Sequence, residues 1–197
     1  MKLIDARKDH YRKLAHEQGF RSRAAFKLKE LNQSYRIIGP GFNVLDLGCA
    51  PGGWTQMAVK LTGNQGKVMG IDLSYVEEIT GAYLIRENIE DEHVIDEIMS
   101  YFGHKINAVI CDLSPKVSGN WSVDHAKQIS LNYDCVKIMD QVLANKGNAV
   151  FKVFDGEYSK EFSDYVKKKF ARINLTKPKA SRKQSSELYC VCLGFIG

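Results

Sequence analysis

The sequence lacks the features that mark membrane, secreted and low-complexity proteins. No apolar run reaches the ~20 residues that a bilayer-spanning helix needs, and the N-terminus has no apolar signal-peptide core. The four prolines are scattered singly, and no repeat or linker-like tract interrupts the chain. We therefore expect a cytosolic, monomeric protein with one domain over residues 1–197, in which residues 1–36 form a basic helical extension.

Cysteine and histidine are too few and too scattered for a disulfide framework or a metal site. The five cysteines form no C-x-x-C pair, and their number is odd. The five histidines have no metal-like spacing, since His10 and His16 would lie on different faces of one helix. We expect free thiols in a reducing compartment and no bound metal. The cysteines are Cys49, Cys111, Cys135, Cys190 and Cys192.

Acidic residues are scarce in two segments of the chain. Residues 1–36 carry ten Lys and Arg against four Asp and Glu, and residues 166–183 carry eight Lys and Arg and no acid. The formal net charge of the whole chain is +5, so the remainder of the chain is acidic. Two basic segments beside an acidic body favour a bound polyanion, although two solvated helix faces would give the same composition.

Predicted strands and helices alternate between residues 42 and 176. This alternation indicates an α/β fold, with a mostly parallel sheet and helices on both faces. Ser22 is predicted to cap a helix that Gly39-Pro40-Gly41 ends. The other predicted helices cover residues 5–18, 54–61, 91–101, 123–143 and 160–170, and the predicted strands cover residues 42–47, 67–73, 82–86, 106–113, 148–154, 172–175 and 187–195.

Three acids fall at the predicted carboxyl ends of strands. They are Asp46, Asp72 and Asp112. Ligands of doubly wound sheets bind outside the carboxyl ends of the strands, at the point where the strand order reverses. A single such acid would more often cap the next helix, but three at one edge favour a binding site.

A glycine-rich turn follows the first of these strands. The segment runs Val44-Leu45-Asp46-Leu47-Gly48-Cys49-Ala50-Pro51-Gly52-Gly53-Trp54-Thr55. It matches neither the phosphate-binding P-loop pattern nor the dinucleotide pattern G-x-G-x-x-G. Glycines let the backbone approach a ligand closely, and Asp72 follows at a spacing that suits a carboxylate holding ribose hydroxyls. A tight turn without a ligand is the alternative interpretation.

These residues resemble the cofactor loop of the FtsJ/RrmJ-type RNA 2′-O-methyltransferases. Four further blocks are similar to that family, in order, so that the resemblance spans residues 21–195. The blocks are Arg21-Ser22-Arg23-Ala24-Ala25-Phe26-Lys27-Leu28, Cys111-Asp112-Leu113-Ser114-Pro115 with the loop from Ser118 to His125, Phe151-Lys152-Val153-Phe154-Asp155-Gly156, and Ser185-Ser186-Glu187-Leu188-Tyr189.

The resemblance implies a fold, a cofactor and cofactor-binding residues. The fold would be the class I Rossmann-like methyltransferase fold, with a seven-stranded sheet whose last strand is antiparallel. The cofactor would be S-adenosyl-L-methionine, lined by Gly52 and Trp54, held at its ribose by Asp72 and met at its methionine end by Asp112. The acid that the family places near the adenine falls on Asn88 here, so Glu87 or Glu90 could take that role instead.

The resemblance also implies a catalytic set of Lys27, Asp112, Lys152 and Glu187. Lys152 is unusual on physical grounds alone, because it interrupts an apolar strand where an unpaired charge is costly to bury; an edge-strand lysine facing water is the alternative. A lysine can serve as a base when burial or nearby cations lower its pKa, whereas nearby carboxylates oppose this. We assign Lys152 as the base, or as the group contacting the 2′-oxygen, with Asp112 positioning it.

Lys27 and Glu187 would orient the acceptor ribose, although a lysine in a basic helix is usually solvated. The basic segments would hold the RNA backbone. The loop over residues 116–125 is a candidate for contacting the target nucleotide through Trp121, which could equally anchor the next helix in the core.

We expect the substrate to be 23S-type ribosomal RNA or the large ribosomal subunit, and the methylated ribose to belong to a uridine. The short length and the absence of extra domains favour this target over the tRNA anticodon loop, which other family members methylate. A non-catalytic RNA-binding assembly factor is a further alternative, against which the complete catalytic set argues. A small-molecule O-methyltransferase would not need two basic segments beside its site.

Overall fold

The computed structural model describes residues 3–116, 118–182 and 184–197, with side chains from His10 onward. Lys2 and Lys183, which belong to the two basic segments, lie outside the described residues, as do the side chains of Arg7 and Lys8. No helix in the described part of the chain has the length and apolar character needed to cross a membrane.

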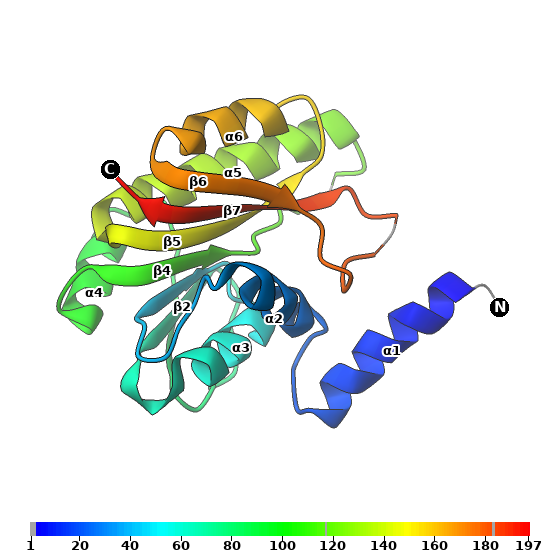
Figure 1. Cartoon of the computed structure of the whole chain (residues 1–197), viewed down its shortest axis with the longest axis horizontal. Helices are drawn as coiled ribbons and strands as arrows, with labels where there is room; N and C mark the ends of the chain where they lie inside the picture. The colour runs from blue at the N-terminus through cyan, green and yellow to red at the C-terminus, as the bar shows by residue number, and fades with distance from the viewer. Residues whose placement is uncertain (1–2, 117, 183) are drawn as a thin grey trace.

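A seven-stranded sheet organises the molecule (Figure 1), with the strand order β3-β2-β1-β4-β5-β7-β6. The first five strands of the chain pair in parallel, and β7 lies antiparallel between β5 and β6. The expected sheet, including its antiparallel last strand, is therefore confirmed. The strands are β1 (Val44–Leu47), β2 (Val68–Asp72), β3 (Ala82–Arg86), β4 (Ile106–Cys111), β5 (Leu143–Phe154), β6 (Phe170–Thr176) and β7 (Glu187–Phe195).

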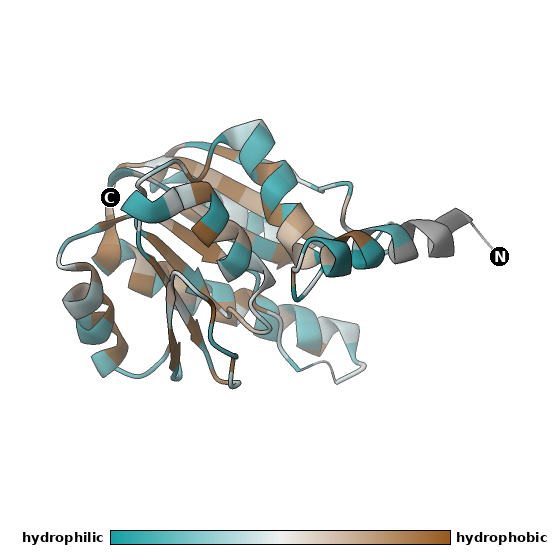
Figure 2. Ribbon diagram, turned by 90° about the horizontal axis from the view of Figure 1, so that it is seen from below, coloured by the Kyte–Doolittle hydropathy of each residue, from teal (hydrophilic) through white to brown (hydrophobic). Residues whose placement is uncertain are grey.

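Helices cover both faces of the sheet, and each face has its own apolar core. One core contains buried residues of α2 and α3, and the other contains buried residues of α4, α5 and α6. In Figure 2 the strands are mostly hydrophobic, whereas the helices around them carry hydrophilic stretches. The helices are α1 (Leu3–Glu17), α2 (Ala24–Tyr35), α3 (Gly53–Thr62), α4 (His93–Phe102), α5 (Trp121–Val142) and α6 (Ser159–Lys167), with a short 3-10 turn η1 (Gly63–Gln65).

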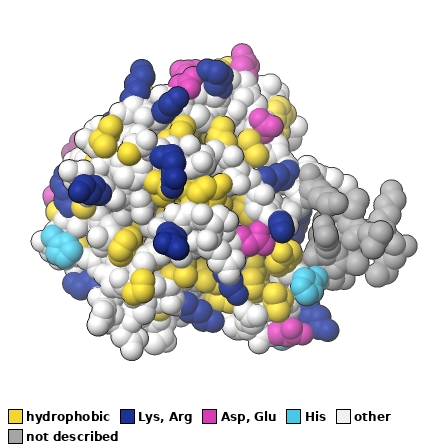
Figure 3. Space-filling view, in the orientation of Figure 1, with side chains coloured by type: hydrophobic (Ala, Val, Ile, Leu, Met, Phe, Trp, Pro, Cys, Tyr) yellow, Lys and Arg dark blue, Asp and Glu magenta, His cyan; other side chains and the backbone are white. Residues whose placement is uncertain are grey.

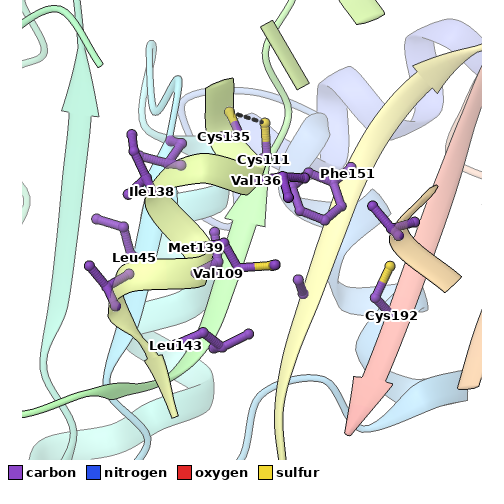
Figure 4. Close-up of a cluster of buried hydrophobic side chains, with 14 of the residues drawn as sticks. Leu45, Val109, Cys111, Cys135, Val136, Ile138, Met139, Leu143, Phe151 and Cys192 are labelled. Carbon is purple, nitrogen blue, oxygen red and sulfur yellow. Dashed lines mark hydrogen bonds between the residues drawn. The ribbon is translucent and has the colours of Figure 1, made fainter. Parts of the chain in front are cut away.

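The cysteines within the described residues are all buried and free. Figure 4 shows Cys111 of β4 beside Cys135 of α5 in the second core, with their sulfur atoms 3.3 Å apart. Burial raises the pKa of the Cys135 thiol well above its usual value. These thiols therefore act as small apolar side chains that pack helix α5 onto the sheet.

The start and the end of α2 differ from the prediction. Arg23 occupies the N-cap position without a side-chain hydrogen bond to the helix, so the predicted Ser22 cap is wrong. The Ser22 hydroxyl is instead buried against the glycine-rich turn, where a Cβ on Gly53 would lie 2.2 Å from Ser22 Oγ. The helix ends when Arg36 adopts a left-handed conformation (φ 54°), before Gly39-Pro40-Gly41 is reached.

Helix α1 projects from the body of the molecule (Figure 1), and its second half joins it to α2. The Tyr11 hydroxyl donates to Glu30 Oε1 over 2.9 Å, and the Tyr11 ring lies 5.7 Å from that of Phe26. Helix α2 itself is part of the core, since Phe26, Leu28 and Leu31 are buried. The basic N-terminal segment thus contains one projecting helix and one helix that packs on the sheet.

Candidate active site

The candidate site lies at the carboxyl ends of β1, β2, β4 and β5. The chain moves from β1 outward to β2 and β3, and then returns to the other side of β1 with β4, so the strand order reverses between β1 and β4. This is the position at which doubly wound sheets bind ligands. Asp46, Asp72 and Asp112 all fall at this edge, as the sequence predicted.

The turn between β1 and α3 requires glycine at two positions. Gly48 has φ 77°, and a Cβ there would lie 2.2 Å from Leu113 Cδ2, in the segment that follows Asp112. Gly52 has φ 109°, and its Cβ would lie 2.6 Å from Ile79 Cδ1. Left-handed backbone and close approach together exclude larger residues. The glycines therefore pack the turn tightly between the segments that follow β2 and β4.

Asp46 is fully buried beneath this turn. Its Oδ2 accepts a 2.6 Å hydrogen bond from Thr55 Oγ1, while its Oδ1 has no hydrogen-bond partner among the described residues. Burial, reinforced by the nearby charges of Asp112 and Asp72, raises the pKa of Asp46 to about 7 despite the Thr55 hydrogen bond. Asp46 thus lies under the site, rather than on its surface.

Asp72 fixes the turn to the end of β2. Its Oδ2 accepts from the Ala50 amide at 2.9 Å, and its Oδ1 accepts from the Ser74 amide at 2.7 Å. A carboxylate oxygen can accept a second hydrogen bond, and Asp72 is only partly buried. Its carboxylate is therefore positioned by the backbone and still able to receive hydroxyl groups.

Lys152 is paired with Asp112 in the middle of the sheet. Its Nζ lies 3.3 Å from Asp112 Oδ1 and donates to the Asp112 carbonyl oxygen at 2.6 Å. Strand β5 lies between β4 and β7, and Lys152 is 4% exposed, so the edge-strand alternative is wrong. Gln128 and Asn132 of α5 donate to the Lys152 carbonyl oxygen and hold the backbone at this position.

Tyr189 joins the two halves of the predicted catalytic set. Its hydroxyl donates to Asp112 Oδ1 at 3.0 Å and accepts from Lys27 Nζ at 3.0 Å. Lys27 Nζ also contacts Glu187 Oε2 at 2.9 Å. The four predicted residues are therefore connected in one hydrogen-bonded series, Glu187–Lys27–Tyr189–Asp112–Lys152.

The buried charges in this series stabilise one another through pairing of opposite signs. Lys27 is 5% exposed, so the solvated alternative is wrong for it. Burial opposes ionisation of Glu187, but the charges of Lys27 and Lys152 and the Lys27 hydrogen bond lower the pKa of Glu187 below its usual value. Burial and the neighbouring carboxylates raise the pKa of Tyr189 well above its usual value, so the phenol keeps its proton.

Tyr189 has no role predicted from the sequence, although it ends one of the family-like blocks. One signal in the sequence could have revealed it. Residues two apart on a strand point to the same face, so Tyr189 shares a face with Glu187. The antiparallel pairing of β5 with β7 also places Tyr189 opposite Lys152.

Two other predicted cofactor residues have defined surroundings. Trp54 is buried, its Nε1 donates to the Ala24 carbonyl oxygen at 2.8 Å, and its ring lies 5.7 Å from that of Tyr189. Asn88 lies after β3, and its Oδ1 accepts from the Glu90 amide at 3.2 Å. Glu87, one of the two alternatives to Asn88, lies 3.5 Å from His93 Nε2. Their contacts with a cofactor stay predictions.

Several basic side chains bind carbonyl or carboxylate groups of the protein itself. Arg21 donates to the carbonyl oxygens of Glu77 and Glu78 at 2.7 Å, which ties the segment after β2 to the N-terminal segment. Lys169 is paired with Asp140 at 2.7 Å. Figure 3 shows other Lys and Arg side chains spread over the face seen in Figure 1, with hydrophobic atoms between them.

One group of possible metal ligands occurs among the described residues, away from the predicted catalytic set. Ligand atoms of Glu87, His93 and Glu97 lie within 4.8 Å of one another at the edge of the sheet formed by β3. Exposed acidic groups are common without an ion. The expectation that the protein binds no metal stays a prediction.

Comparison with known proteins identifies the family. The model of the FtsJ-like methyltransferase family matches residues 20–195. Proteins named ribosomal RNA large subunit methyltransferase E are 87% identical in Nitrosopumilus maritimus and 62% identical in Cenarchaeum symbiosum, each over the whole of both chains. A solved structure from Plasmodium falciparum, named as a candidate ribosomal RNA methyltransferase, has a TM-score of 0.82 and 30% identity, and covers 90% of this chain and 100% of its own. The expected family and enzyme class are thereby confirmed: the chain belongs to the FtsJ-like methyltransferases.

Proposed function

We propose that this protein transfers a methyl group from S-adenosyl-L-methionine to a ribose 2′-hydroxyl in large-subunit ribosomal RNA. The observation that carries the proposal is the series Glu187–Lys27–Tyr189–Asp112–Lys152 beside the glycine-rich turn. The archaeal relatives that are 87% and 62% identical over their whole length carry the name of a large-subunit ribosomal RNA methyltransferase. The expectation that the nucleotide is a uridine belongs to this proposal.

The residues at the sheet edge fit S-adenosyl-L-methionine. The Asp72 carboxylate is oriented by two backbone amides and partly exposed, which suits the two hydroxyls of a ribose. Asp112 lies across the turn, at the end of β4, where it can meet the methionine end. Gly52 and the backbone at Trp54 would line the space between them, and Asn88 would contact the adenine.

Bound S-adenosyl-L-methionine supplies a methyl group on a positively charged sulfur, which is already activated for displacement. The protein must therefore orient the acceptor hydroxyl and receive its proton. Lys152 Nζ would contact the 2′-oxygen and, in its neutral form, accept the hydroxyl proton. Asp112 and the Asp112 carbonyl oxygen hold this nitrogen in place, over 3.3 Å and 2.6 Å.

Lys27 and Glu187 would orient the ribose at the other end of the series. Tyr189 keeps its proton, because its pKa is raised. Its hydroxyl can therefore donate to Asp112 while it accepts from Lys27, so it fixes the positions of these two side chains relative to each other. A displacement of Lys27 would consequently shift Asp112 and Lys152. In this proposal the series acts as one unit.

Arg23 and Arg182 are suited to the RNA backbone. Burial and the neighbouring positive charge of Arg182 lower the pKa of Arg23, although Glu187 and Tyr189 oppose this. Two guanidinium groups near one another favour binding of an anion between them, and the nearby Glu187 carboxylate works against this. A phosphate of the substrate RNA would relieve their repulsion and place the neighbouring ribose close to the catalytic series.

Transfer of labelled methyl groups tests the proposal. The protein is incubated with labelled S-adenosyl-L-methionine and, separately, with unmethylated large ribosomal subunits, the isolated large-subunit RNA and tRNA. We expect label in large-subunit RNA, on a 2′-oxygen. Label in tRNA alone would favour the anticodon-loop alternative, and cofactor binding without transfer to any RNA would favour the non-catalytic alternative.

A further inference from the structure

Three aromatic rings lie in a row beside the catalytic series. The Trp121 and His125 rings are parallel to within 5°, with centroids 6.0 Å apart, and the His125 and Tyr158 rings lie 5.5 Å apart at 25°. These separations are those of offset stacking. We call Trp121, His125 and Tyr158 the aromatic row.

The two ends of the row face solvent, while its centre does not. Trp121 is 49% exposed and Tyr158 is 39% exposed, whereas His125 is 2% exposed. Two large half-exposed rings therefore lie on either side of the buried imidazole. About half of the Trp121 surface is therefore accessible to a ligand.

The row is held rigidly from both sides. Asp124 accepts hydrogen bonds from Ser118 N at 2.7 Å, Ser118 Oγ at 2.8 Å and Gly119 N at 3.2 Å, which fixes the segment before Trp121. On the other side, the backbone at Gly156 packs on the imidazole, since a Cβ there would lie 2.6 Å from His125 Cε1. A rigid surface loses little conformational entropy when a ligand binds.

The row begins close to the catalytic lysine. Trp121 lies 5.6 Å from the Phe154 ring, between centroids. Phe154 follows Lys152 by two residues on β5, which is about 7 Å along a strand. A nucleotide whose ribose reaches Lys152 would thus bring its base, or the next one along the chain, to the row.

We infer that the aromatic row stacks an unpaired RNA base next to the acceptor ribose. This inference rests on the proposed function, because it takes RNA as the substrate. Every base offers a π-face, and unpaired RNA bases commonly stack on aromatic side chains. A stacked base would hold the ribose at Lys152 without requiring a particular sequence, and a base-paired acceptor would first have to open.

Binding of two short chains tests the inference: an oligouridylate, and an abasic ribose-phosphate chain of the same length. Both have the same charge, so their difference in affinity reports on the bases. We expect the wild-type protein to prefer the oligouridylate about tenfold, and Trp121→Ala and Tyr158→Ala to bind both chains alike. Trp121→Phe, which keeps a ring, should retain most of the preference.

Tyr83→Ala is the matched control. Tyr83 is 42% exposed and stacks on Tyr101 at 4.8 Å, but it lies on β3, with three strands between β3 and β5. Its loss should leave the preference unchanged. The inference is wrong if the wild-type protein shows no preference, or if Trp121→Ala and Tyr158→Ala keep it.

Methyl transfer separates this inference from the proposed function. If the wild-type protein methylates large-subunit RNA and both alanine variants keep its KM for RNA, the function stands and the aromatic row is not a base site. If no RNA is methylated, but the preference for the base-bearing chain disappears in both variants, the row binds bases and the proposed function is wrong.

Discussion

Lys152 and Tyr189 lie directly opposite each other in the pairing of β5 with β7, and both contact Asp112 Oδ1. The distances are 3.3 Å from Lys152 Nζ and 3.0 Å from the Tyr189 hydroxyl. One carboxylate oxygen at the end of β4 therefore aligns groups from two other strands. The position of Lys152 depends on this three-strand junction as well as on its own ion pair.

Tyr189→Phe tests this dependence. The variant keeps the ring in the core, but removes the hydroxyl that links Lys27 to Asp112. We expect kcat to fall about tenfold, the effect of one lost hydrogen bond to a positioned charged group. The KM for cofactor should stay unchanged. Steady-state kinetics with both substrates checks this split; an unchanged kcat would show that the phenol has no positioning role.

Glu187→Gln leaves the Lys27 ammonium without its carboxylate. The Lys27 side chain is 7% exposed, and a buried charge that loses its partner destabilises a fold by about 3 kcal/mol or more. The double variant Lys27→Met with Glu187→Gln should recover part of this stability while staying inactive. Urea unfolding of the three proteins measures the difference. Equal stability of the single and double variants would argue against a buried ion pair.

Asp46 gives the stability of the protein an unusual pH dependence. Its pKa is about 7 in the folded protein and 3.8 in the reference state. Between about pH 4 and pH 7 the Asp46 carboxyl is therefore protonated in the folded protein but ionised in the unfolded protein. Because the folded state binds the extra proton, the contribution of Asp46 to the free energy of unfolding falls as the pH rises from about 4 to 7. The loss is on the order of 4 kcal/mol.

Asp46→Asn should remove this pH-dependent loss of stability. We expect the stability of the variant relative to wild type to increase from pH 4 to 7 and then to level off. Chemical unfolding at several pH values measures the two curves. Parallel curves would mean that Asp46 ionises normally in the folded protein.

Gly48→Ala separates steric packing from backbone strain. Gly48 and Gly103 both have φ 77°, but a Cβ at Gly48 would lie 2.2 Å from Leu113 Cδ2, whereas a Cβ at Gly103 meets nothing within 4 Å. Gly103→Ala therefore reports the cost of the left-handed backbone alone, about 1 kcal/mol. Gly48→Ala should cost more and weaken cofactor binding. A similar decrease in the free energy of unfolding in the two variants would show that the Leu113 side chain moves aside at little cost.

Much of the site could be predicted because it follows strand periodicity. An apolar strand that contains one charged residue predicts a buried functional group, and Lys152 is such a residue. The three strand-end acids also lie at one edge, since parallel strands share the direction of their carboxyl ends. Asp46 differs from the other two because β1 extends past it to Leu47, which leaves its carboxylate beneath the turn.

The remaining features depend on contacts between distant segments. Ser22 matches the local pattern of a helix cap, but its hydroxyl is buried against Gly53, far along the sequence. The role of Tyr189 depends on the register between β5 and β7, which a single sequence does not determine. The internal use of Arg21 likewise depends on carbonyl groups of the segment after β2. Local patterns identify none of these partners.

Lys152→Ala gives the most direct test of the central claim. Methyl transfer to unmethylated large ribosomal subunits is measured for the variant and the wild-type protein, together with the affinity of each for S-adenosyl-L-methionine. We expect transfer to be abolished and cofactor affinity to stay near the wild-type value, because in the proposed function Lys152 contacts the acceptor rather than the donor. Near wild-type turnover in the variant would contradict the assignment of Lys152.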